Sequence, residues 1–226
     1  MHGWFPEDIS TYGPDIDRVF SLIYYIVGFW FVFTQVAIIA FLVRYRRRAH
    51  VPARPVRGER WRELAWILVP AAIVLVLDLG IDAAGARVWD AVKKDLPPGD
   101  VHLAITAKQF EWLVTYPGPD GKLGTADDFT VNSQLHVPQG KNVRVTLRSQ
   151  DVVHSFFLPN VRLKQDAVPG RSIDLWFNAT KAGTYELACA ELCGFGHYTM
   201  RGVFVVESPE AYAAWVAQHA ASGGGA

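Results

Sequence analysis

Two long apolar stretches dominate the first third of the chain. Val19 to Val43 contains no Asp, Glu, Lys, Arg or His, and Leu64 to Ile81 is interrupted only by Asp78. As a helix, each stretch is long enough to cross the roughly 30 Å hydrocarbon layer of a bilayer. A signal peptide would follow a basic segment, whereas the residues before Arg18 carry four carboxylates and neither Lys nor Arg. We therefore predict a hairpin of two transmembrane helices in a lipid bilayer.

The segment between the two apolar stretches is rich in arginine. Its eight arginines are Arg44, Arg46, Arg47, Arg48, Arg54, Arg57, Arg60 and Arg62. Short loops of this composition stay on the cytoplasmic side of a membrane. We therefore expect both termini, and everything after the second helix, on the outer (periplasmic or equivalent) side.

The hydrophobic pattern changes from long runs to alternation after residue 96. Apolar residues occupy every second position at Val101–Ile105, Val143–Leu147, Ile173–Phe177 and Val203–Val205, with Gly/Pro-rich turn signals between these runs. Period two is typical of half-buried strands, and short strands spaced in this way favour a β-sandwich or Greek-key barrel. The acidic segment 120–128 lacks the spacing and terminal Glu of an EF-hand, so we interpret it as a long hairpin turn rather than a calcium site.

These patterns divide the chain into three parts. We expect an N-terminal segment and membrane anchor over 1–95, a β-domain over 96–209, and a short helix followed by a disordered tail over 210–226. Ser208 is placed to cap that helix. The formal net charge of +0 gives no broad basic surface, which excludes nucleic acid as an expected partner.

Both cysteines lie in one short segment that carries further soft metal ligands. Cys189 and Cys193 are followed by His197 and Met200, and His154 lies upstream. Thiolate, imidazole and thioether are ligands that copper prefers, whereas Met is a poor zinc ligand. A single blue copper needs one Cys, so the second thiolate is best used if the pair bridges two copper ions. A disulfide is the alternative in an oxidising compartment, but it requires neither the His nor the Met.

The chain resembles subunit II of cytochrome c oxidase over nearly its whole length. The segments 151–156 and 189–200 carry the most specific part of this resemblance. The resemblance implies a two-helix hairpin carrying a cupredoxin-like Greek-key domain and the binuclear copper centre called CuA. It implies the following ligands: His154 and Met200 on one copper, His197 and the backbone carbonyl of Glu191 on the other, and Cys189 and Cys193 between them. It also implies that the Glu191 side chain reaches a magnesium or manganese ion at the boundary with subunit I.

The resemblance further implies the role of an electron-accepting subunit in a proton-pumping haem-copper oxygen reductase. Its partners would be subunits I and III and a c-type cytochrome donor, with catalysis at haem in subunit I and no catalytic residue here. The run from Glu63 through Trp66 to Pro70 is similar to the family's Glu-x-x-Trp-x-x-x-Pro, where the Glu lies at a proton-channel entrance. An ordinary charge at a helix end is the alternative for Glu63.

One motif departs from the family pattern. The family has Gln-Trp-x-Trp in the first strand of the domain, and its first Trp receives the electron, whereas this chain has Gln109-Phe110-Glu111-Trp112. Phe110 and Trp112 are therefore the candidates for this role, and the donor is either soluble or membrane-bound, alone or within a supercomplex. Two other functions remain as alternatives: a quinol oxidase subunit II, which lacks the copper ligands, and a copper-delivery protein, which would release a single copper.

Overall fold

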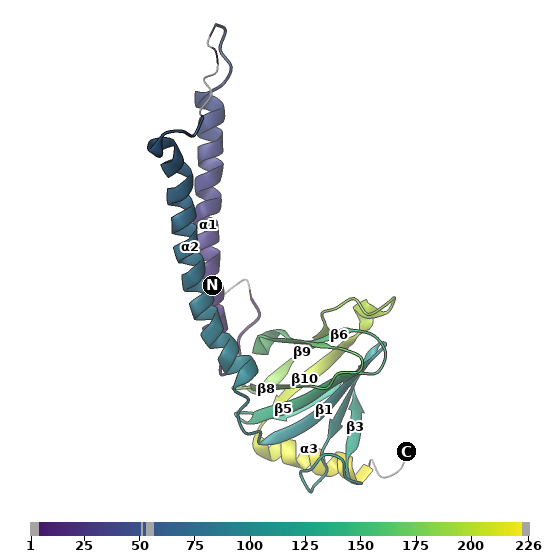
Figure 1. The fold of residues 1–226 in the computed structure, drawn as a ribbon. Coiled ribbons are helices and arrows are strands. Elements are labelled where there is room, and N and C mark those ends of the chain that lie inside the picture. Colours follow the sequence, from purple (N-terminus) through teal and green to yellow (C-terminus); the bar gives the residue numbers. More distant parts are fainter. Residues whose placement is uncertain (1–4, 51, 53–56, 223–226) are drawn as a thin grey trace. The chain divides into compact units, whose positions relative to one another are not determined.

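The computed structural model describes residues 5–50, 52 and 57–222. Arg54 lies outside the described residues. So do residues 223–226 of the glycine-rich tail, for which we expected disorder. The chain divides into two compact units (Figure 1). One unites the described parts of Met1–Pro14 and Asp90–Ala226, and the other is Asp15–Trp89.

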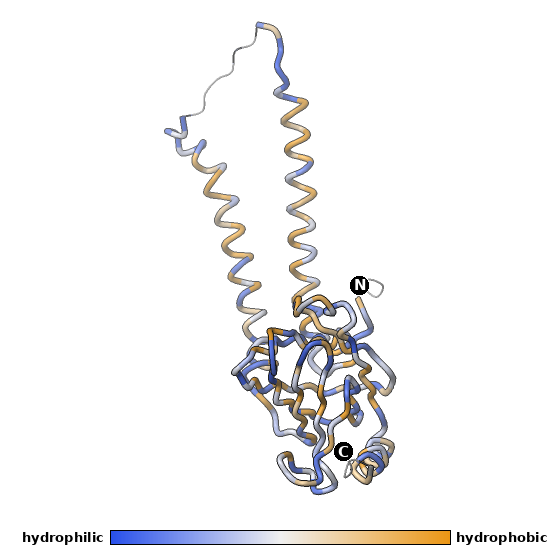
Figure 2. The backbone as a smooth tube through the Cα atoms, turned by 90° about the vertical axis from the view of Figure 1, so that its right-hand side faces the viewer, coloured by the Kyte–Doolittle hydropathy of each residue, from blue (hydrophilic) through white to orange (hydrophobic). Residues whose placement is uncertain are grey.

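The predicted helical hairpin is confirmed. α1 covers Gly13–Arg44 and α2 covers Trp61–Trp89, and both are long and apolar enough to cross a membrane. Their side chains are largely exposed, and hydrophobic residues prevail along both helices (Figure 2). Such helices need apolar surroundings, which lipid or other membrane subunits provide. A π-helical segment, Asp90–Lys94, follows α2.

The unit that contains Asp90–Ala226, here called the β-unit, is a sandwich of two five-stranded sheets, as the alternating pattern predicts. The sheet orders are β3-β2-β1-β5-β8 and β4-β10-β9-β6-β7. The strands are β1 Val101–Lys108, β2 Glu111–Tyr116, β3 Phe129–Asn132, β4 Gln134–Pro138, β5 Asn142–Ser149, β6 His154–Leu158, β7 Leu163–Ala167, β8 Ile173–Asn178, β9 Gly183–Cys189 and β10 Arg201–Glu207. Two pairs, β1 with β5 and β4 with β10, are parallel, and the remaining pairs are antiparallel.

Short helical segments complete this unit. The 3-10 turns cover Pro159–Val161 and His197–Thr199, and helix α3 covers Pro209–Ser222. The Ala211 amide donates to Ser208 Oγ (3.2 Å) at the start of α3, which is the expected cap. Trp215 of α3 stacks on His136 of β4, with ring centroids 4.1 Å apart.

Alternate positions of the strands fill the space between the two sheets. In β5, the residues Val143, Val145 and Leu147 are all at most 1% exposed. The face that we predicted for β10 is wrong: Val203 is 42% exposed, whereas Phe204 is 0% exposed and faces the core. Residues 203–206 are all apolar, so a period of two cannot indicate which alternate set points inward.

Residues 5–12, here called the N-terminal strap, pack against the β-sandwich. Ile9 is 1% exposed; its amide donates to Asn160 O (2.8 Å), and its carbonyl accepts from the Thr180 amide (2.6 Å). Lys181 Nζ also contacts Glu7 Oε1 at 2.6 Å. The β-unit is therefore completed by residues that precede the first helix in the sequence.

Candidate metal centre

Three strand ends meet where the predicted ligands lie. β6 begins at His154, β9 ends at Cys189, and β10 begins directly after Met200. The antiparallel pairing of β6 with β9 places Phe156 opposite Cys189. Hydrogen bonds from the Cys189 amide to Met200 O (3.1 Å) and from the Ala190 amide to Ser155 O (2.9 Å) close the connection. We call residues 189–200 the ligand loop.

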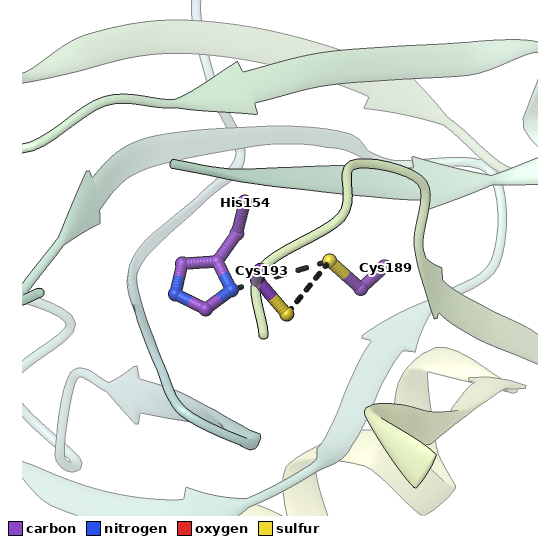
Figure 3. A group of neighbouring side chains, drawn as sticks. All are labelled: His154, Cys189 and Cys193. Atoms are coloured by element: carbon purple, nitrogen blue, oxygen red, sulfur yellow. Dashed lines mark hydrogen bonds between the residues drawn. The ribbon is translucent and has the colours of Figure 1, made fainter. Parts of the chain in front are cut away.

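The two thiols and the His154 imidazole point toward one another (Figure 3). The Sγ atoms of Cys189 and Cys193 are 3.9 Å apart, far beyond the length of about 2.05 Å of a disulfide bond. His154 Nδ1 lies 4.0 Å from Cys189 Sγ. Both cysteines are therefore free thiols within reach of a shared metal ion.

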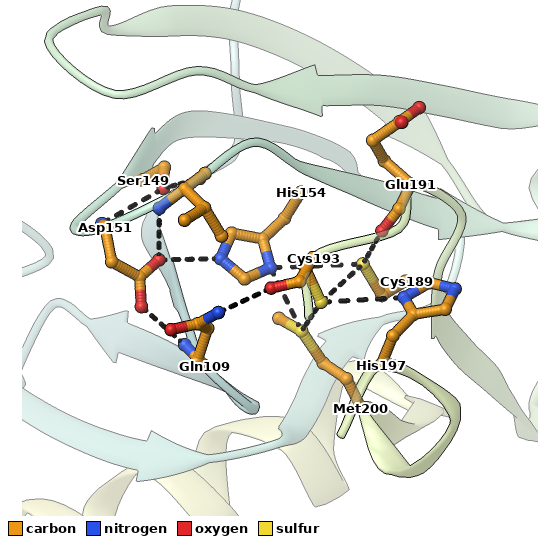
Figure 4. A network of polar contacts seen from close by, with 10 residues as sticks. Gln109, Ser149, Asp151, His154, Cys189, Glu191, Cys193, His197 and Met200 are labelled. Carbon is orange, nitrogen blue, oxygen red and sulfur yellow. Dashed lines mark hydrogen bonds and ion pairs between the residues drawn. The ribbon is translucent and has the colours of Figure 1, made fainter. Parts of the chain in front are cut away.

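The other predicted ligands lie beside the two cysteine thiols (Figure 4). Met200 Sδ lies 3.2 Å from His154 Nδ1 and 3.7 Å from Cys193 Sγ. His197 Nδ1 lies 3.5 Å from Cys193 Sγ, and the Glu191 carbonyl lies 3.3 Å from Cys189 Sγ. The structure thus brings together all the residues that the sequence suggested as copper ligands.

The spacing of these donor atoms can be compared with that of a metal site. In a tetrahedral site with bonds of about 2.0–2.3 Å, two ligand atoms lie roughly 3.3–3.8 Å apart. The distances given above range from 3.2 to 4.0 Å. Two thiols flanked by one imidazole on either side form a soft donor set for more than one ion. The residues present therefore fit a copper site.

Burial separates the inner ligands from water. His154 is 0%, Met200 1% and Cys193 4% exposed. Burial, together with the neighbouring Cys189 thiol, raises the pKa of Cys193 to about 11. A cation that binds here must displace thiol protons, so ion binding and proton release are linked.

An acidic residue that the sequence analysis did not select orients His154. Asp151 Oδ1 lies 2.8 Å from His154 Nε2, which leaves Nδ1 facing the sulfur atoms. Although partial burial opposes ionisation, hydrogen bonds from His154 and from the Gln109 and Val152 amides hold the pKa of the Asp151 carboxyl below its usual value. An Asp three residues before a candidate ligand His is the signal that could have identified it.

The family pattern suggested that Gln109 and Phe110 lie in the first strand of the domain. They instead form the turn between β1 and β2. Phe110 is partly exposed beside the ligand loop, near Gly194 and Gly196. Trp112 in β2 is 0% exposed, and its ring centroid lies 6.2 Å from that of His154. Both aromatic candidates therefore lie close to the site, but only Phe110 offers an exposed edge to another protein.

The two glutamates with expected roles differ in their surroundings. The Glu191 side chain is exposed and points away from the thiols, while its carbonyl faces Cys189 (Figure 4). Glu63 belongs to the other unit, where its Oε2 accepts a hydrogen bond from the Gly58 amide (2.8 Å) at the start of α2. This bond supports a local role at a helix end for Glu63.

Comparison with known proteins gives a consistent result. Residues 103–208 match the family model described as cytochrome c oxidase subunit II, periplasmic domain. The chain is 33% identical to cytochrome c oxidase subunit 2 of Thermostichus vulcanus, with 97% of this chain and 80% of the relative covered. It is 32% identical to the alternative cytochrome c oxidase subunit 2 of Bradyrhizobium diazoefficiens, with coverages of 95% and 84%.

A solved structure extends the similarity to the fold. It is the crystal structure of the periplasmic domain of subunit II of cytochrome oxidase of Bradyrhizobium japonicum, which is 31% identical. The superposition gives a TM-score of 0.51 and covers 57% of this chain and 99% of that domain. The β-unit therefore has the cupredoxin-like fold that the sequence resemblance implied.

Proposed function

Since the chain belongs to the cytochrome c oxidase subunit II family, we propose that it accepts electrons for a proton-pumping haem-copper oxygen reductase. The donor is a c-type cytochrome, and the electrons pass to haem in subunit I, where oxygen is reduced. The observation that carries this proposal is the convergence of two thiols, two imidazoles and a thioether at one end of the sandwich.

The chain's own residues hold the redox centre. Cys189 and Cys193 would be shared by two copper ions, His154 and Met200 would hold one ion, and His197 with the Glu191 carbonyl would hold the other. The copper pair supplies a one-electron redox centre whose charge is spread over both metals. The ligand loop is fixed by backbone hydrogen bonds at both of its ends, so the ligands need to move little when the charge changes. Small rearrangement favours fast electron transfer.

Phe110 and Trp112 define the side on which the donor arrives. Phe110 has the exposed edge, and Trp112 fills the buried space next to His154. Phe110 in place of the family's Trp leaves a smaller aromatic contact, which suits a donor other than soluble cytochrome c, such as a membrane-bound cytochrome or one in a supercomplex. Glu191 would contribute a carboxylate to a magnesium or manganese ion at the subunit I boundary.

The membrane arrangement follows from the helices and the arginine-rich connection. α1 and α2 cross the bilayer and contact lipid together with subunits I and III. Both termini and the copper domain, residues 96–209, lie on the outer side because the arginine-rich segment stays in the cytoplasm. Glu63 then lies at the cytoplasmic end of α2, the position from which it could serve a proton channel.

Copper stoichiometry and electron paramagnetic resonance test this function. The full-length chain, purified in detergent and loaded with copper, should hold two copper ions. Its spectrum should show hyperfine coupling of one electron to two copper nuclei. A copper-delivery protein would hold one ion with a localised signal. That result, or the absence of copper, would contradict the proposal.

A further inference from the structure

The turn between β1 and β2 supplies none of the proposed copper ligands, yet it contacts both parts of the chain that do. One part is the ligand loop, and the other is residues 151–154, here called the His154 arm. These two parts contact each other through the His154 ring, whose Nδ1 lies 3.2 Å from Met200 Sδ and 4.0 Å from Cys189 Sγ. Gln109, at the tip of the turn, lies between them (Figure 4).

Gln109 makes one short hydrogen bond to each part. Its side-chain Nε2 donates to the carbonyl oxygen of Cys193 at 2.6 Å. Its backbone amide donates to Asp151 Oδ2 at 2.7 Å, and Asp151 in turn orients His154. A continuous path of hydrogen bonds therefore runs from the Cys193 backbone through Gln109 and Asp151 to the His154 ring.

The turn itself is held in place independently of a metal. Lys108 pairs with Glu111 across the hairpin, and their side chains form an ion pair of 2.7 Å. The Gln150 amide also donates to Ala107 O (2.9 Å), which ties the end of β1 to the chain just before the His154 arm. Gln109 is thus presented by a short hairpin with a fixed register.

The ligand loop fits closely onto this turn. A β-carbon added at Gly196 would lie 2.6 Å from Cδ2 of Phe110, and one at Gly194 would lie 2.7 Å from Gln109 Nε2. Only glycine allows the loop backbone to approach so closely. The turn is therefore a platform whose shape the ligand loop matches at two positions.

We propose that Gln109 is a positioning residue that holds Cys193 and His154 in register before copper binds. The inference rests on the proposed function, because it concerns the same copper centre. Without the side-chain amide, the Cys193 carbonyl loses its tie to the turn, and the ligand loop can move relative to the His154 arm. Copper should then leave more readily, and the coupling between the two ions should change.

Two substitutions and a matched control separate this role from general stabilisation. Gln109→Met keeps the length of the side chain and removes the donor, and Gln109→Asn keeps the amide but is too short to reach Cys193. Gln139→Met is the control, because Gln139 Nε2 makes an equivalent bond to Thr180 O (2.8 Å) and Gln139 lies in the turn between β4 and β5, outside the copper site.

The experiment measures copper loss from the full-length chain to an excess of chelator, together with the paramagnetic resonance spectrum and the thermal unfolding of the metal-free protein. We expect roughly tenfold faster copper loss and altered hyperfine coupling in both Gln109 variants. The unfolding temperature of the metal-free variants should match that of Gln139→Met. Copper retention and spectra equal to wild type in both variants would overturn the inference alone. A wild-type chain that binds no copper pair would overturn the proposed function and this inference together.

Discussion

Removing the Asp151 carboxylate should weaken copper binding although Asp151 is not a ligand. In Asp151→Ala, His154 Nε2 loses its partner at 2.8 Å, and the amides of Gln109 and Val152 lose theirs at 2.7 and 2.6 Å. The His154 ring is completely buried, so water does not readily replace the carboxylate at Nε2. The ring is then free to rotate and to change the nitrogen that carries the proton.

The magnitude follows from the hydrogen bond to the buried ring. A hydrogen bond to a charged group contributes about 1.5–3 kcal/mol, which corresponds to roughly a 10- to 150-fold change in a binding constant. Asp151→Asn should lower copper affinity less than Asp151→Ala does. Its amide oxygen still accepts from His154 Nε2, while its amide nitrogen faces one of the two backbone donors. We therefore expect copper affinity to fall in the order wild type, Asp151→Asn, Asp151→Ala.

Competition with a chelator of known affinity measures this difference. Asp100→Ala is the control: Asp100 Oδ2 also accepts from a backbone amide, that of Asn142 at 2.9 Å, but Asp100 directly precedes β1, whereas the candidate copper ligands lie beyond the other end of that strand. The reasoning would be refuted if the copper affinities of Asp151→Ala and Asp100→Ala differed by less than about twofold, because the lost hydrogen bond should change the affinity by more than that.

Three further substitutions test separate parts of the account. Cys193→Ser should abolish the copper pair and leave the circular dichroism of the β-unit unchanged, because oxygen is a poor substitute for a bridging thiolate; a normal two-copper spectrum would contradict the bridging role. Phe110→Trp should keep the copper spectrum and change the turnover rate of the assembled oxidase with soluble cytochrome c; an unchanged rate would mean that the electron does not pass this position. Ile9→Ala should lower the free energy of unfolding of the β-unit by about 2–5 kcal/mol in urea titrations, because it leaves a cavity under the strap; a loss below about 0.5 kcal/mol would mean that the strap is not part of the fold.

Much of the fold could be predicted because its elements have different hydrophobic periods. The run from Val19 to Val43, which has no charged residue, indicated a membrane helix, and alternation such as that of Val143–Leu147 indicated a strand with one buried face. β6 could not be predicted from alternation, because four of its five residues are buried. The packing of the strap could not be predicted either, since no local pattern indicates that the Ile9 carbonyl accepts from the Thr180 amide.

The candidate ligands could be predicted because four of them lie within one loop. Their residue types and spacing carry the chemistry without knowledge of the fold. Gln109 could not be selected in this way, since its two partners lie 42 and 84 positions away in the sequence and meet it only in the folded chain. Side chains that bind a metal leave a local pattern, whereas side chains that position those ligands do not.

The most direct test of the copper assignment is anomalous diffraction at the copper edge from crystals of the copper-loaded protein. The account predicts two neighbouring copper peaks, each within bonding distance of both Cys189 Sγ and Cys193 Sγ. A single peak, or sulfur atoms about 2 Å apart in a disulfide with no copper beside them, would contradict it.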